Sequence, residues 1–192
     1  MKRLCVFCGS SKGNNPIFAA AAVQLAKLLM QHNITLVNGG GSVGIMGVMA
    51  NTMLEGGGQV IGIIPQFIVD MEVAHSGLTE LHIVSSMHER KKMMFDLSDG
   101  FVALPGGLGT LEEIFEIVSW AQLKLHDKPC GFLNVAGYFD PLIQFLDEAV
   151  QKGFVRSEHR QMVLQESAPE KLLQQFLTYR SAHIEKLLEK VT

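Results

Sequence analysis

A glycine-rich turn between an apolar run and an amphipathic run most constrains the fold of this chain. Residues 101–104 are apolar, residues 105–113 read PGGLGTLEE, and an amphipathic run follows to residue 125. This order predicts a strand, a tight turn and the beginning of a helix. Glycines let backbone N–H groups approach an anion closely, and a helix N-terminus adds partial positive charge. The segment therefore predicts a phosphate-binding turn.

Strand-like and helix-like runs alternate along the rest of the chain. This alternation predicts one α/β domain over residues 1–192, with a Rossmann-like, doubly wound, mostly parallel sheet and helices on both faces. Ligands of such sheets bind beyond the carboxyl ends of the strands. The expected strands are 4–8, 34–37, 60–64, 81–84, 101–104, 131–134 and 162–164. The expected helices are 16–32, 46–54, 87–97, 111–125, 142–152 and 170–190, and residues 66–79 are expected to be irregular.

Composition excludes several classes of function. The net charge of −3 and the pI of about 6.1 argue against a nucleic-acid partner. No apolar stretch is long enough for a membrane span, and none resembles a signal peptide, so we expect a cytoplasmic protein without membrane contact. The three cysteines, Cys5, Cys8 and Cys130, are expected to be buried thiols. The histidines are scattered, so we expect neither a metal nor a cofactor.

Three glycine loops follow three of the expected strands, at residues 9–11, 39–44 and 105–110. None has the P-loop pattern, and the second lacks the acidic residue of the dinucleotide fingerprint. One glycine loop alone is equally well a tight turn. Three of them at one edge of a sheet predict nucleotide or phosphate binding, with Ser10, Gly40 and Gly41 among the candidates.

Charged residues open two helices at the same edge. Arg90 follows the fourth expected strand, and its guanidinium suits a phosphate or a carboxylate. Glu112 and Glu113 follow the glycine turn, and because consecutive helical positions diverge by about 100°, only one can face a pocket fully. The ordinary alternatives are a solvated basic face for Arg90 and helix-dipole complementarity for the glutamates. His88 is a further candidate acid.

The helix after the glycine turn is apolar around much of its circumference. Such a helix needs cover on several sides, and a second subunit is one source of that cover. The residues concerned are Ile114, Phe115, Ile117, Val118 and Trp120.

The motifs together resemble those of the Lonely Guy (LOG) family of cytokinin riboside 5′-monophosphate phosphoribohydrolases. The PGGLGTLEE segment is similar to the family's P-G-G-x-G-T-x-E-E signature. MHERK at 87–91 and GGGSVGIMG at 39–47 are similar to two further family motifs, and the resemblance covers nearly the whole chain. It implies a nucleotide-binding homodimer that hydrolyses a nucleoside 5′-monophosphate to the free base and ribose 5-phosphate.

The resemblance also implies roles for individual residues. Arg90 and Glu113 match the catalytic pair of the family. The implied phosphate loop is Gly106, Gly107, Gly109 and Thr110. The other residues implied in substrate binding are Ser10, Gly40, Gly41, Glu72, Met87, Lys91, Glu112 and Ser119. Leu108, Ser119 and Ile45 depart from common family residues, which leaves the preferred base open.

Two alternatives to this hydrolase remain at the level of sequence. The same fold can serve as a nucleotide or cofactor carrier without turnover, although a pure binder gains little from a carboxylate beside a phosphate. Transfer of a deoxyribosyl group between bases uses a related glycosidic step. The sequence does not distinguish a prenylated base from plain adenine. The lysine decarboxylase label given to some family members is rejected, because no pyridoxal-type lysine context is visible.

Overall fold

The computed structural model describes residues 1–71 and 73–180 of the chain. Within them lies a seven-stranded sheet in the order β4-β3-β2-β1-β5-β6-β7, and every neighbouring pair is parallel. The strands are β1 (Arg3–Phe7), β2 (Thr35–Asn38), β3 (Val60–Pro65), β4 (Glu80–Val84), β5 (Gly100–Ala103), β6 (Cys130–Leu133) and β7 (Val163–Glu166). The predicted doubly wound α/β sheet is confirmed.

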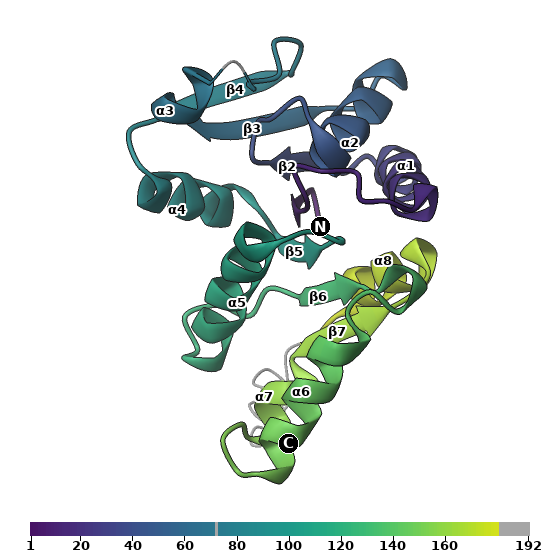
Figure 1. Ribbon diagram of the computed structural model, residues 1–192, viewed down its shortest axis with the longest axis vertical. Coiled ribbons are helices and arrows are strands. Elements are labelled where there is room, and N and C mark those ends of the chain that lie inside the picture. Colours follow the sequence, from purple (N-terminus) through teal and green to yellow (C-terminus); the bar gives the residue numbers. More distant parts are fainter. Residues whose placement is uncertain (72, 181–192) are drawn as a thin grey trace, which may run out of the picture.

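Helices connect the strands and cover both faces of the sheet. The helices are α1 (Pro16–Gln31), α2 (Gly44–Glu55), α3 (Gln66–Val69), α4 (Met87–Leu97), α5 (Leu108–Gln122), η1 (Val135–Gly137), α6 (Asp140–Gln151), α7 (Ser157–Gln161) and α8 (Pro169–Thr178). Figure 1 shows α1, α2 and α8 on one side of the row of strands, and α4 and α5 on the other.

Two apolar cores result from the alternation of side chains along the strands. In β1, Leu4 and Val6 join the core beneath α1, α2 and α8, whereas Cys5 and Phe7 join the core beneath α4 and α5. All four side chains are at most 3% exposed. Strands that are buried on both faces read as continuous apolar runs, which explains why short apolar segments predicted the sheet so well.

Several predicted boundaries need correction. Helix α5 begins at Leu108 and not at residue 111, because Gly107 already takes the extended conformation of an N-cap. It ends at Gln122, short of residue 125. The segment expected to be irregular contains the short helix α3, and η1 and α7 were not predicted. Of the last predicted helix, the structure describes Pro169–Thr178, and the part beyond residue 180 lies outside the described residues.

The sheet reverses its strand order between β1 and β5. The loops that follow these two strands lie side by side, because the Gly9 N–H donates to the Pro105 carbonyl at 3.1 Å. A ligand site is expected at such a switch point, beyond the carboxyl ends of the strands.

No helix in the described part of the chain is long and apolar enough to cross a membrane. The extent of the domain over residues 1–192 stays a prediction.

His126 joins the end of α5 to the strand β6 that follows. Its Nε2 lies 2.9 Å from the Ile117 carbonyl, and its Nδ1 accepts from the Lys128 N–H at 3.1 Å. Only a neutral imidazole with its proton on Nε2 makes both bonds. Burial lowers the pKa of His126, and the nearby Lys128 cation lowers it further, although the Ile117 carbonyl opposes this shift.

Stability should therefore fall as the pH falls through the histidine range. The unfolded chain binds the proton at about pH 6.5 and the folded chain only at lower pH, so this contribution is complete above about pH 6.5 and lost below it. We expect His126→Gln to cost about 1 kcal/mol at pH 7.5 and to lose less stability than the parent on transfer to pH 5.5. Urea unfolding at both pH values measures this. An equal pH dependence in variant and parent would contradict the assignment.

Candidate active site

A buried ion pair lies at the carboxyl edge of the sheet. Arg90 Nη1 lies 2.7 Å from Glu113 Oε1, and the two residues are 7% and 8% exposed. Arg90 comes from the first turn of α4, and Glu113 comes from α5. The pairing of these residues, which the resemblance implied only from motifs, is thus realised as a direct contact between neighbouring helices.

The surrounding backbone fixes the orientation of Arg90. Its Nε donates to the Ile63 carbonyl in β3 at 3.1 Å. Its Nη2 packs so closely against Gly39 that a side chain at position 39 would overlap it. The first glycine after β2 therefore makes room for the guanidinium. Ser86 caps α4 by accepting from the Glu89 N–H, which holds the helical turn that carries Arg90.

Glu113 is held in an environment that penalises its charge. Burial raises the pKa of this carboxyl, the Arg90 cation opposes the shift, and Glu112 adds to it. A buried carboxylate whose pKa is raised by burial and which has a specific charged partner is a recurrent property of catalytic groups. Loss of either partner would leave an uncompensated buried charge, which is strongly destabilising for a pair of this kind.

The turn at the beginning of α5 leaves space for an anion. The N-cap residue, Gly107, provides no side-chain cap, and the Leu108 side chain is 87% exposed. Nothing lies within 4 Å of where a Cβ would stand at Gly107 or Gly109. No protein contact therefore requires glycine at these two positions, and the open space leaves the backbone accessible to a ligand. Thr110 is 4% exposed in the same turn.

A cavity of about 290 Å³ adjoins this turn at the switch point. It is lined by the glycine turn, including Gly106 and Gly107, and by the adjacent loop at residues 9–13, including Ser10. Phe18, Ile45 and Tyr138 provide apolar surface. Arg90 and Glu113 are not among the residues that line this cavity.

Lys91 lies between two carboxylates of α5. Its Nζ is 2.5 Å from Glu112 Oε1 and 3.0 Å from Glu116 Oε1. The Lys91 side chain is 11% exposed, whereas that of Glu112 is 54% exposed. The expectation that only one of the adjacent glutamates faces inward is confirmed, since Glu113 is buried. Sequence reasoning missed Glu116, which helix spacing places one turn beyond Glu112.

The second glycine loop uses its N–H groups inside the chain. The Gly40 N–H donates to Asn38 Oδ1 at 2.9 Å, and the Gly41 N–H donates to the sulfur of Met46 at 3.1 Å. These two N–H groups are therefore occupied by the side chains of Asn38 and Met46, and the loop contributes to the site through the space that Gly39 leaves for Arg90. The proposed contact of Gly40 and Gly41 with substrate rests on their position alone.

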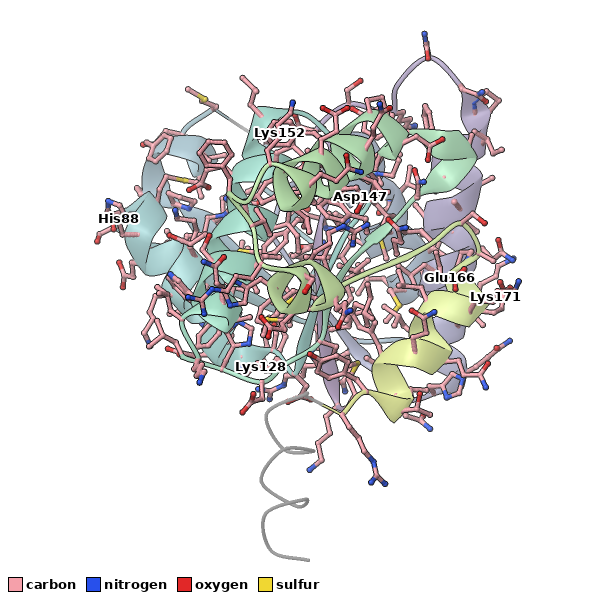
Figure 2. The ribbon with its side chains drawn as sticks, turned by 90° about the horizontal axis from the view of Figure 1, so that it is seen from below. His88, Lys128, Asp147, Lys152, Glu166 and Lys171 are labelled. Atoms are coloured by element: carbon pink, nitrogen blue, oxygen red, sulfur yellow. The ribbon has the colours of Figure 1, made fainter. Side chains whose placement is uncertain are left out.

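The structure shows where three further predicted residues lie relative to the Arg90–Glu113 pair, and a fourth lies outside the described residues. Met87 begins α4, one turn before Arg90. Ser119 is exposed and donates to the Phe115 carbonyl, about 9 Å along α5 from Glu113. His88 is exposed, and Figure 2 shows it at the periphery of the molecule. Glu72 lies outside the described residues.

Sequence reasoning also missed Tyr138, whose hydroxyl donates to the Gly106 carbonyl at 2.7 Å. Its segment follows a turn in which Ala136 has a φ of 52° and Gly137 a φ of 72°. The Asn134 side chain closes this turn by accepting from the Phe139 N–H and donating to Asp140. Strained turns of this kind cluster at functional sites, but the sequence signals only a glycine before an aromatic pair.

The apolar helix α5 finds most of its cover within the chain. Ile114 and Ile117 are buried, Phe115 packs against Phe132, and Trp120 packs against Phe95. The breadth of its apolar surface therefore gives less support to a subunit interface than the sequence suggested. Among the described residues, no group of three or more His, Cys, Asp or Glu side chains could hold a metal ion.

Comparison with known proteins agrees with the motifs. Residues 46–176 match a family model described as "possible lysine decarboxylase". The chain is 46% identical over 190 residues to the probable cytokinin riboside 5′-monophosphate phosphoribohydrolase LOGL2 of Oryza sativa subsp. japonica, covering 99% of this chain and 78% of that protein. It is 44% identical over 189 residues to the cytokinin riboside 5′-monophosphate phosphoribohydrolase LOG1 of Arabidopsis thaliana, covering 98% and 88%.

A solved structure confirms the fold at lower identity. The molybdenum cofactor binding protein of Rippkaea orientalis superposes with a TM-score of 0.68 and 23% identity, covering 93% of this chain and 99% of that chain. At this identity the likeness concerns the fold only. The plant relatives match over nearly the whole of this chain, and the family model matches more than half of it, so this chain is a member of the LOG family.

Proposed function

We propose that this protein hydrolyses the N-glycosidic bond of a purine nucleoside 5′-monophosphate, giving the free base and ribose 5-phosphate. The observation that carries the proposal is the buried contact of Arg90 with Glu113 beside the uncapped N-terminus of α5. The names of relatives that are 44–46% identical over nearly the whole chain support the same reaction class. Adenine and N6-prenylated adenine are the candidate bases.

The phosphate turn positions the substrate in this proposal. The 5′-phosphate binds the free N–H groups at the beginning of α5, where Gly107 and Gly109 leave space for its oxygens. Thr110 is an additional hydroxyl donor in this turn. Binding energy from the phosphate then holds the anomeric carbon of the ribose near the carboxyl of Glu113.

Glu113 acts on the sugar in this mechanism. As the bond between the anomeric carbon and the base nitrogen breaks, its electron pair leaves with the base and positive charge develops on the ribose. The Glu113 carboxylate stabilises that charge, and it accepts a proton from the water whose oxygen forms the new bond to carbon. The departing base nitrogen then takes up this proton, which gives the neutral base and regenerates the carboxylate. Arg90 holds the carboxylate in place and assists departure of the base.

Two other activities receive less support. A non-catalytic carrier of the same fold has no evident use for a buried carboxylate with a raised pKa, and the curated relatives are phosphoribohydrolases. Lysine decarboxylation through a pyridoxal-type cofactor needs a lysine that is free to form a Schiff base. Lys91, the lysine nearest to Arg90 in sequence, is instead held between Glu112 and Glu116.

The proposal also covers the location and assembly of the enzyme. We propose that it acts in the cytoplasm as a homodimer. The net charge of −3 supports the absence of a nucleic-acid partner. Large apolar side chains that remain exposed support self-association, because their burial is favourable. They include Met71 at 69%, Leu123 at 66%, Leu125 at 65% and Phe154 at 87% exposure.

The first prediction of this proposed function concerns Glu113. Incubation of the protein with AMP should release adenine and ribose 5-phosphate in equal amounts. Glu113→Gln should lower kcat by about a hundredfold or more, because it removes the negative charge that stabilises the sugar cation. Chromatography of the products measures the turnover, and equilibrium dialysis with AMP should show that binding is retained.

Glu112→Gln is the matched control, since it makes the same change at the adjacent, half-exposed carboxylate. We expect it to keep kcat within about threefold of the parent, because Glu112 is half-exposed and Lys91 keeps its second carboxylate, Glu116. Full activity of Glu113→Gln would remove this residue from the mechanism. AMP binding by the parent without release of either product would support the carrier instead.

The pH dependence of the rate forms a second prediction. Burial raises the pKa of Glu113, and the reaction needs its carboxylate form. The rate should therefore be lost as the pH falls through that raised pKa, so the acidic limb of kcat/KM should lie above the ordinary glutamate range of about pH 4.3. A profile that stays flat down to pH 4 would show that the carboxylate is not required.

The oligomeric state yields a third prediction. Light scattering at micromolar protein concentration should give a mass twice the 21.1 kDa of one chain, because dimerisation covers exposed apolar surface. A mass of one chain at every concentration tested would reject the homodimer while leaving the reaction untouched.

A further inference from the structure

The charges around the Arg90–Glu113 pair do not suit a phosphate by themselves. Arg90 is engaged by Glu113, and Lys91 is shared by Glu112 and Glu116. This group of five side chains holds two cations and three carboxylates, so its formal charge is −1. A nucleoside monophosphate brings about two more negative charges, which this group repels. Another cation near the glycine turn would offset this repulsion.

Lys12 is positioned to supply that charge. It lies in the loop at residues 9–13 and lines the same cavity of about 290 Å³ as Gly106 and Gly107. Among the described residues that line this cavity, Lys12 is the one with a charged side chain. It is exposed, and no carboxylate lies within ion-pair distance of it in the described part of the chain.

The backbone fixes the position of this lysine next to the glycine turn. The Gly9 N–H donates to the Pro105 carbonyl, and the Gly9 carbonyl accepts from the Ile45 N–H at 3.0 Å. The backbone at residues 10 and 11 packs against Gly44 so tightly that a side chain at position 44 would collide with it. The loop is thus anchored to both neighbouring segments, whereas the Lys12 side chain is free to move toward a ligand.

We propose that Lys12, from the loop after β1, binds the 5′-phosphate of the substrate and thereby selects phosphorylated nucleosides over nucleosides. This role rests on the proposed function and extends it to a residue outside the motifs. The lysine acts as a point charge, while the N–H groups at the beginning of α5 give the directional hydrogen bonds. Selectivity for the phosphate then comes from two separate segments, after β1 and after β5.

Two substitutions of Lys12 test the role. Lys12→Gln should raise KM for AMP and the inhibition constant of ribose 5-phosphate by the same factor, about three- to tenfold, with kcat within twofold of the parent. Lys12→Arg should restore most of the affinity, since the charge is kept. Raising the salt concentration should weaken AMP binding more in the parent than in Lys12→Gln, because salt screens an exposed charge.

Lys27→Gln is the matched control. Lys27 is exposed on α1 and does not line the cavity, so this variant has the same net charge as Lys12→Gln without the proposed loss. KM for AMP should be unchanged in it. Unaltered KM in Lys12→Gln, or an equal rise in both variants, would overturn the role of Lys12 while the hydrolase stands. If the parent releases no base from any monophosphate, the proposed function fails, and dialysis with ribose 5-phosphate still decides whether Lys12 binds the phosphate.

Discussion

The buried contact between Arg90 and Glu113 is the interaction on which the site depends. Two charged groups that are 7% and 8% exposed lose most of their hydration, and they remain charged together only because each satisfies the other. The fold surrounds the pair with backbone: Ile63 accepts from the guanidinium, and Gly39 has no side chain to obstruct it. Burial still raises the pKa of Glu113 against the pull of Arg90, which suits a carboxylate that must accept a proton during turnover.

The parallel sheet explains why the components of the site meet. All seven strands run in one direction, so the loops after β1, β2, β3 and β5 gather at one edge. The reversal of strand order between β1 and β5 separates α1 and α2 from α4 and α5, and it opens the cavity between the loop at residues 9–13 and the glycine turn. The glycine turn can thus present N–H groups to a phosphate, with Lys12 lining the adjoining cavity and Glu113 in the helix that the turn begins.

The sequence predicted the sheet, the glycine turn and the inward position of one glutamate, because local patterns determine these features. The pairing of Arg90 with Glu113 was also expected, but the ion pairs of Lys91 were not, since they depend on the packing of α4 against α5. Lys91 was expected to bind substrate, but it lies between Glu112 and Glu116. Tyr138 and Lys12 were missed for a related reason: an aromatic residue after a glycine and an exposed lysine in a loop are ordinary until the fold brings them to Gly106 and Gly107.

The most direct measurement of this account is a crystal structure of the Glu113→Gln variant with bound AMP. The account predicts a phosphate on the N–H groups at the beginning of α5, with the anomeric carbon of the ribose in contact with the amide at position 113 and the guanidinium of Arg90 close by. A nucleotide bound elsewhere, or one whose anomeric carbon lies on the far side of the glycine turn from residue 113, would contradict it.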